Sequence, residues 1–183
     1  MAQTENHFIL PAPKFTDPAR ILIVISPYYR DVADNLLEGA KRAIHMAGGI
    51  HDVVQVPGAL EIPPAIRIAT AARYYEGYVA LGCIVRGETT HYETVCNESA
   101  RGLMELGLEG LCIGNGILTV ENMDQANARA DHTDQNKGGG AADAAMHLVA
   151  LKRRFTKTGA GRISPSSEHF LMAGTPKTNP GAA

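Results

Sequence analysis

Two periodicities of hydrophobic and polar residues alternate along this chain. Short apolar runs rich in β-branched residues are typical of parallel strands that helices cover on both faces. Four such runs occur, at residues 20–25, 52–56, 78–85 and 110–118. Apolar residues at steps of three and four predict helices near residues 32–44, 61–69, 90–107, 121–129 and 141–155. Strands that alternate with helices predict an α/β fold, a three-layer α/β/α sandwich around a four-stranded parallel sheet.

The two ends of the chain lack these periodicities. Residues 1–19 are polar and are interrupted by Pro11 and Pro13, so we expect a flexible N-terminal segment. Residues 156–183 are rich in Gly, Pro, Ser and Thr, which predicts a disordered tail. One α/β domain therefore spans residues 20–155, and its strand order is expected to resemble the flavodoxin-like order.

The third apolar run leads through Gly87 into a helix. Thr90 and Glu93 stand three residues apart, the spacing of a capping box, which predicts a helix that starts at Thr90. His91 then lies in the first turn, where the positive end of the helix dipole favours a neutral imidazole that can accept or donate a proton. A lone histidine is more often a tolerated first-turn residue, but the surrounding turn favours a functional role.

The same turn is a candidate anion site. Unpaired N–H groups at a helix start, together with Arg86, Thr89 and Thr90, are groups that a phosphate or an oxyanion binds. In open parallel sheets, ligands bind beyond the carboxyl ends of the strands, and this turn follows such an end.

These residues also resemble the signature of the lumazine synthase family of riboflavin biosynthesis. Three ordered blocks carry the resemblance: residues 56–63 (VPGALEIP), residues 82–98 around RGETTHY and CNE, and residues 119–138 with TVEN, QA, Arg129 and NKG. The similarity covers the chain from about residue 20 to residue 155. It implies a transferase that condenses 5-amino-6-(D-ribitylamino)uracil with 3,4-dihydroxy-2-butanone 4-phosphate to 6,7-dimethyl-8-ribityllumazine, phosphate and water, without a metal or a redox cofactor.

The resemblance also implies roles for particular residues. His91 would be the catalytic acid/base. The aminouracil would contact Tyr28, Ala59, Leu60, Glu61, Cys83, Ile84, Val85 and Asn115. The butanone phosphate would contact Glu88, Thr89 and Arg129, with Arg86, Thr90 and Lys137 in support. Asn115 and Gly140 depart from the family, which often has an aromatic and an acidic residue at these positions.

From the residues alone, two of these roles have simpler alternatives. Tyr28 follows the first strand, where an aromatic ring either stacks on a flat ligand or covers the edge of the core. Glu61 in a first helical turn either contacts the substrate or complements the helix dipole.

The composition argues against several other classes of protein. The chain has 17 basic and 19 acidic residues, a net charge of −2 and no tryptophan, so a nucleic-acid partner is not expected. Its three cysteines have no C-x-x-C spacing, which argues against a zinc site, and no Walker or G-x-G-x-x-G loop indicates a nucleotide cofactor. Without a signal-peptide pattern or an apolar run of membrane-spanning length, we expect a cytoplasmic protein without a membrane partner.

The resemblance implies protein partners as well. Members of the family form homopentamers with active sites between subunits, in some cases twelve pentamers in an icosahedral shell, and riboflavin synthase is a candidate partner. Two other functions stay open at this point: a non-catalytic paralogue that binds flavin or lumazine, and a purely structural shell or carrier.

Overall fold

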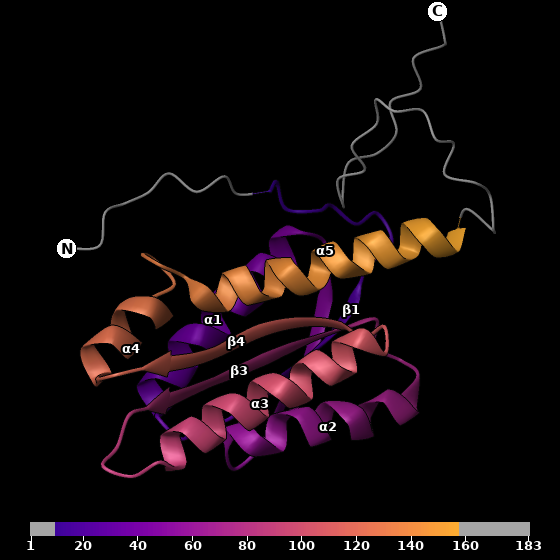
Figure 1. Ribbon diagram of the computed structural model, residues 1–183. Coiled ribbons are helices and arrows are strands. Elements are labelled where there is room, and N and C mark those ends of the chain that lie inside the picture. Colours follow the sequence, from indigo (N-terminus) through magenta and orange to yellow (C-terminus); the bar gives the residue numbers. More distant parts are fainter. Residues whose placement is uncertain (1–9, 158–183) are drawn as a thin grey trace, which may run out of the picture.

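The computed structural model describes residues 10–157 and contains a parallel sheet between two layers of helices (Figure 1). Its strands are β1 (Arg20–Ile25), β2 (Ile50–Gln55), β3 (Gly77–Val85) and β4 (Cys112–Val120). They lie in the order β2-β1-β3-β4 with parallel pairing throughout. The predicted three-layer α/β fold with the flavodoxin-like strand order is therefore confirmed.

Helices cover both faces of this sheet. They are α1 (Arg30–Met46), α2 (Ile62–Ala69), α3 (His91–Leu108), α4 (Met123–Ala130) and α5 (Lys137–Lys157), with 3-10 turns η1 (Ala59–Glu61) and η2 (Thr70–Ala72) around α2. Helices α1 and α5 pack on one face and α2 and α3 on the other (Figure 1). Each face therefore has its own apolar core, one under α1 and α5 and a smaller one under α2 and α3.

The apolar core explains why the limits of β1 and β3 were predicted to within one residue, whereas the edge strands β2 and β4 differ by one or two residues at each end from the predicted 52–56 and 110–118. Strand β1 matches the predicted residues 20–25, and five of its six residues are buried. Strand β3 begins one residue before the predicted start, and its first eight residues are buried. A strand covered on both faces shows in the sequence as a continuous apolar run, so its limits are easy to recognise.

Helix α5 starts earlier than the sequence predicted. It begins at Lys137 instead of residue 141, because residues 138–140 are glycines, which weaken the helical signal. A Cβ atom on Gly138 would lie 2.0 Å from the carbonyl oxygen of Leu36 in α1, so glycine allows the two helices to approach closely. The side-chain oxygen of Asn136 accepts a hydrogen bond from the N–H of Gly139 at 3.0 Å and stabilises the helix start.

A glycine in β4 has a similar role. A Cβ atom on Gly114 would lie 1.8 Å from the carbonyl oxygen of Ala141 in α5, so glycine lets this helix approach the strand closely.

The end of the N-terminal segment contacts the domain. The N–H of Phe15 donates a hydrogen bond to the carbonyl oxygen of Ala47 at 2.8 Å, and Ala19 is fully buried. This part of the expected flexible segment is thus anchored. The predicted tail was to start at residue 156, but residues 156 and 157 belong to α5; the rest of it, residues 158–183, lies outside the described residues. No helix within residues 10–157 is long and apolar enough to cross a membrane.

Candidate functional site

The carboxyl ends of β1 and β3 and the start of α3 enclose a cavity of about 390 Å³, which we call the His91 cavity. It is lined by predicted site residues Tyr28, Ala59, Leu60, Glu61, Cys83, Ile84, Val85, Thr89 and His91. Ser26, Tyr29, Tyr92 and Val95 also line it, although the sequence analysis did not select them. Only their position in the sequence could have indicated them, since each lies within four residues of a predicted site residue or of a strand end.

The floor of the His91 cavity is apolar and neutral. Burial raises the pKa of the Cys83 thiol to about 11, so this group stays protonated and is a poor nucleophile. Burial also raises the pKa of Tyr29, and the neighbouring Tyr28 and Cys83 add to this effect. The cavity floor can therefore hold a flat neutral ring without a competing charge.

The two tyrosines after β1 differ in exposure. The Tyr28 and Tyr29 rings meet edge to face, with their centroids 5.1 Å apart. Tyr29 is half-buried, whereas Tyr28 is 73% exposed. Tyr28 thus does not cover the core and keeps a ring face available for stacking.

The opposite wall is a tight backbone turn. In η1, the N–H of Glu61 donates to the carbonyl oxygen of Gly58 at 3.3 Å, and a Cβ atom on Gly58 would lie 2.8 Å from the carboxylate of Glu61. Prolines in the first turn of α2 hold the following backbone rigid. Backbone groups and the Glu61 carboxylate are therefore the polar groups on this side of the cavity.

His91 is the first residue of α3, as predicted, but the capping box does not form. The side chain of Thr90 makes no capping hydrogen bond; instead, the N–H of His91 donates to the hydroxyl oxygen of Thr89 at 3.4 Å. The carboxylate of Glu93 is occupied by Arg86. The capping-box prediction is wrong because an ion pair competes for Glu93. The His91 side chain is exposed at the cavity and is available to a ligand.

Arg86 is not a free anion-binding group. Its guanidinium donates hydrogen bonds to Glu121, at 2.7 Å, and to Glu93. These carboxylates raise the pKa of Arg86, and Arg86 lowers the pKa of Glu93. Two carboxylates therefore compensate the charge of Arg86, and its supporting role at a phosphate site stays a prediction. Glu88 is exposed in the same turn and does not line the cavity.

A second cavity, the Arg129 cavity, lies along the outer edge of β4 and has a volume of about 360 Å³. Arg129, Lys137, Asn115 and Gly140 line it. Arg129 donates to the carbonyl oxygen of Gln125 at 3.1 Å, and the side chain of Asn115 accepts from the N–H of Ile117 at 2.9 Å. No acidic residue lines this cavity, and within residues 10–157 neither of its cations is paired with a carboxylate.

The two cavities share no lining residue. Consequently, one chain does not bring Arg129, Lys137 and Asn115 together with His91. The separation follows from topology: the His91 cavity opens at the ends of β1 and β3, whereas the Arg129 cavity follows the free edge of β4.

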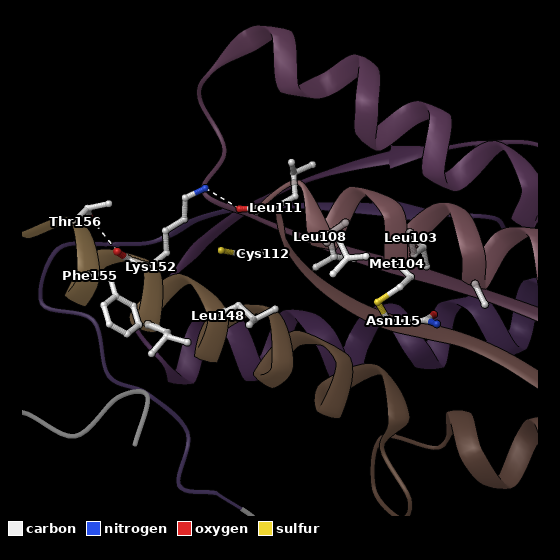
Figure 2. A pocket seen from close by; sticks show the side chains of 15 residues that line it. Leu103, Met104, Leu108, Leu111, Cys112, Asn115, Leu148, Lys152, Phe155 and Thr156 are labelled. Atoms are coloured by element: carbon white, nitrogen blue, oxygen red, sulfur yellow. Dashed lines mark hydrogen bonds between the residues drawn. The ribbon is translucent and has the colours of Figure 1, made fainter. Parts of the chain in front are cut away.

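A third cavity of about 600 Å³ lies between α3, α5 and the start of β4 (Figure 2). Its wall is made mainly of apolar side chains, among them Leu108, Leu148 and Phe155. The ammonium group of Lys152 donates to the carbonyl oxygen of Gly110 at 2.9 Å. This cavity lies at the amino end of β4 and has no free acid/base group, so it is not the candidate site despite its size. Among residues 10–157, no three His, Cys, Asp or Glu side chains are grouped to hold a metal ion.

Comparison with known proteins places this arrangement in a family. Residues 18–153 match the family model for 6,7-dimethyl-8-ribityllumazine synthase. A 6,7-dimethyl-8-ribityllumazine synthase of Jannaschia sp. is 49% identical over 80% of this chain and 82% of its own length. Proteins of the same name are 54% identical in Sphingopyxis alaskensis, over 75% of this chain and 97% of theirs, and 56% identical in Methylorubrum extorquens, over 73% and 81%.

Proposed function

The chain belongs to the 6,7-dimethyl-8-ribityllumazine synthase family, and from this premise we propose that it forms 6,7-dimethyl-8-ribityllumazine from 5-amino-6-(D-ribitylamino)uracil and 3,4-dihydroxy-2-butanone 4-phosphate. One observation carries the proposal. The side chains that this reaction requires occur in two separate half-sites: a cavity with an apolar floor and an exposed histidine, and a cavity whose two cations have no carboxylate partner within residues 10–157.

The His91 cavity is suited to the aminouracil. A flat heterocycle fits between the exposed Tyr28 ring and the apolar wall of Cys83 to Val85. The backbone of Ala59 and Leu60 and the carboxylate of Glu61 are groups that hydrogen-bond a ribityl chain.

The Arg129 cavity is suited to the phosphate of the second substrate. A guanidinium forms paired charge-assisted hydrogen bonds to phosphate oxygens, and Lys137 adds a second positive charge in the same cavity. Thr89 lines the His91 cavity just before the start of α3, and Glu88 and Thr90 belong to the same turn. These residues would complete the phosphate site when the two half-sites meet.

We place the complete site between two subunits. The Arg129 cavity of one chain would face the His91 cavity of its neighbour. The Arg129 cavity is accessible to a neighbour because β4 is an edge strand of the sheet. A closed ring repeats this head-to-tail contact, and a homopentamer is the ring that we propose from the family resemblance. A twelve-pentamer shell, an association with riboflavin synthase and a cytoplasmic location rest on the same resemblance. Light scattering of the purified protein distinguishes a pentamer from a shell.

The proposed chemistry needs proton transfer and orientation. An amine of the uracil forms an imine with the butanone carbonyl, phosphate leaves, and the second amine closes the ring. His91 would donate and accept protons in these steps, a contribution of roughly 10²–10⁴ in rate for a well-placed acid/base. Holding two substrates in register supplies a further part of the rate.

Turnover and subunit mixing test the function and the shared site together. The wild-type protein is expected to form lumazine, followed by absorbance, well above the spontaneous background. Oligomers of His91→Ala alone or Arg129→Ala alone are expected to be nearly inactive. Oligomers assembled from an equal mixture regain activity at about a quarter of their sites, because random assembly in a ring pairs an intact His91 with a neighbour's intact Arg129 that often.

Other results would decide against the proposal. A wild-type protein that binds flavin but forms no lumazine would be the non-catalytic paralogue instead. Mixed oligomers as inactive as the parent variants would place both residues in one subunit's site. The two cations of the Arg129 cavity, which have no carboxylate partner among the described residues, favour the enzyme, since a flavin carrier needs no site for the phosphate of a second substrate.

A further inference from the structure

We propose that Arg86 is a positioning residue that ties the turn carrying His91 to the turn that begins α4. This role goes beyond the charge support that the sequence suggested, and it rests on the proposed function of His91 and Arg129. The contacts of the guanidinium support this role.

Arg86 joins two segments that are distant in the sequence. Its Nε donates to the carboxylate of Glu121 at 2.7 Å, and its Nη1 donates to the carboxylate of Glu93. Its backbone N–H donates to the carbonyl oxygen of Val120 at 2.9 Å. Arg86 thus links the end of β3, the first turn of α3 and the end of β4. We call Arg86, Glu93 and Glu121 the Arg86 clamp.

The Arg86 clamp also holds a wall of the His91 cavity. The guanidinium carbon lies 4.1 Å from the centre of the Tyr92 ring, a cation–π distance. Tyr92 follows His91 directly and lines the His91 cavity. A planar guanidinium bonded on two sides and stacked on a third fixes the first turn of α3 in one orientation, and with it the direction of the His91 side chain.

The other end of the Arg86 clamp leads toward Arg129. The N–H of Glu121 donates to the side chain of Gln125 at 3.1 Å, and Asn122 caps α4 by accepting from the N–H of Gln125 at 3.0 Å. The carbonyl oxygen of Gln125 in turn accepts from Arg129. A continuous set of hydrogen bonds therefore runs from the turn of His91 to the side chain of Arg129. In a shared site, Arg86 would set the angle between the two half-sites that one chain offers to its two neighbours.

Arg101 on α3, the helix whose first turn Arg86 contacts, provides a matched control. It also donates to two glutamates, Glu98 and Glu105, but all three belong to α3, and Arg101 lines neither half-site. The side chains of Arg86 and Arg101 are 40% and 61% exposed, and exposed ion pairs add little to global stability. A loss of function that is specific to Arg86 would therefore report positioning and not folding.

The experiment compares Arg86→Gln, Arg86→Lys, Glu121→Gln and Arg101→Gln. For Arg86→Gln we expect kcat to fall about tenfold, because a misplaced acid/base is costly, with KM for the aminouracil within about twofold and Tm within about 3 °C of wild type. Arg86→Lys should not restore kcat, since one ammonium cannot bond both carboxylates and stack on Tyr92. In the double variant, Glu121→Gln should lower kcat little beyond the loss in Arg86→Gln, because both substitutions break the Arg86 clamp. Arg101→Gln should keep wild-type kcat.

Hydrogen exchange gives a readout that does not need turnover. Amides of residues 87–92 and 121–125 should exchange faster together in Arg86→Gln and not in Arg101→Gln. Unchanged kcat in Arg86→Gln, an equal loss in Arg101→Gln, or exchange that rises in only one of the two segments would overturn the positioning role. A wild-type protein without turnover would end the proposed function, and the exchange data would still decide whether Arg86 couples the two turns.

Discussion

The His91 cavity and the Arg129 cavity have opposite chemical character although they belong to one small domain. The His91 cavity has an apolar floor, a protonated thiol and one exposed imidazole. The Arg129 cavity has two cations without a carboxylate partner among the described residues and no acidic residue in its wall. The first can hold a neutral ring and move protons, whereas the second can neutralise a dianion. The difference indicates that neither half-site suffices for a reaction between a heterocycle and a phosphate ester.

Among the variants that test this comparison, the removal of the imidazole should have the largest effect on activity. In His91→Ala, kcat should fall by roughly 10²–10⁴ because the exposed imidazole that would transfer protons is removed, while KM for both substrates changes little. Steady-state lumazine formation measures both parameters. His45→Ala is the control, since His45 is exposed in the last turn of α1, outside the cavity. A loss of less than about tenfold would remove His91 from the acid/base role.

Removal of the guanidinium should affect the second substrate selectively. We expect kcat/KM for the butanone phosphate to fall about 100-fold in Arg129→Ala, because hydrogen bonds to charged groups contribute about 1.5–3 kcal/mol each. The loss should appear mainly as a higher KM for the phosphate substrate. Arg67→Ala, which removes an exposed arginine that bonds Thr70, should behave as wild type. Equal losses toward both substrates would contradict the assignment of Arg129 to the phosphate.

The exposed tyrosine should affect the first substrate selectively and more weakly. Stacking contributes about 0.5–1.5 kcal/mol, so Tyr28→Ala should raise KM for the aminouracil about three- to tenfold. Tyr28→Phe keeps the ring and should bind normally. Because Tyr28 is 73% exposed, a thermal unfolding curve should be the same for both variants. A lowered Tm in Tyr28→Ala alone would indicate a packing role instead.

The smallest effects should come from the glycines at the start of α5, next to the Arg129 cavity. A Cβ atom on Gly140 meets nothing within 4 Å, so Gly140→Ala should raise the free energy of unfolding by about 1 kcal/mol through helix propensity. Gly138→Ala should lower it by more than this, because the Cβ atom would collide with the backbone of α1. Urea unfolding measures both changes. If both variants were stabilised, the close approach of α1 and α5 would not depend on glycine.

Local features of the chain could be recognised without the structure. The limits of β1, the start of α3 at His91 and the capping role of Asn122 follow from apolar runs and from side chains that act on their own turn. Most residues of the His91 cavity were predicted from the family resemblance, whose short motifs are local features of the sequence. Glu93 was misassigned because the alternative partner, Arg86, lies seven residues away and is brought near by the fold.

The sequence by itself determined the fold class, the limits of the central strands β1 and β3 to within one residue, and the family, since these depend on periodicity and on short ordered motifs. Only the tertiary structure decided which groups meet. It separated Arg129 and Asn115 from His91, because one cavity follows the edge of β4 and the other opens at the ends of β1 and β3. It also brought Arg86 into contact with two carboxylates. Such pairings depend on distances between segments far apart in the chain, and no local pattern of residues encodes them.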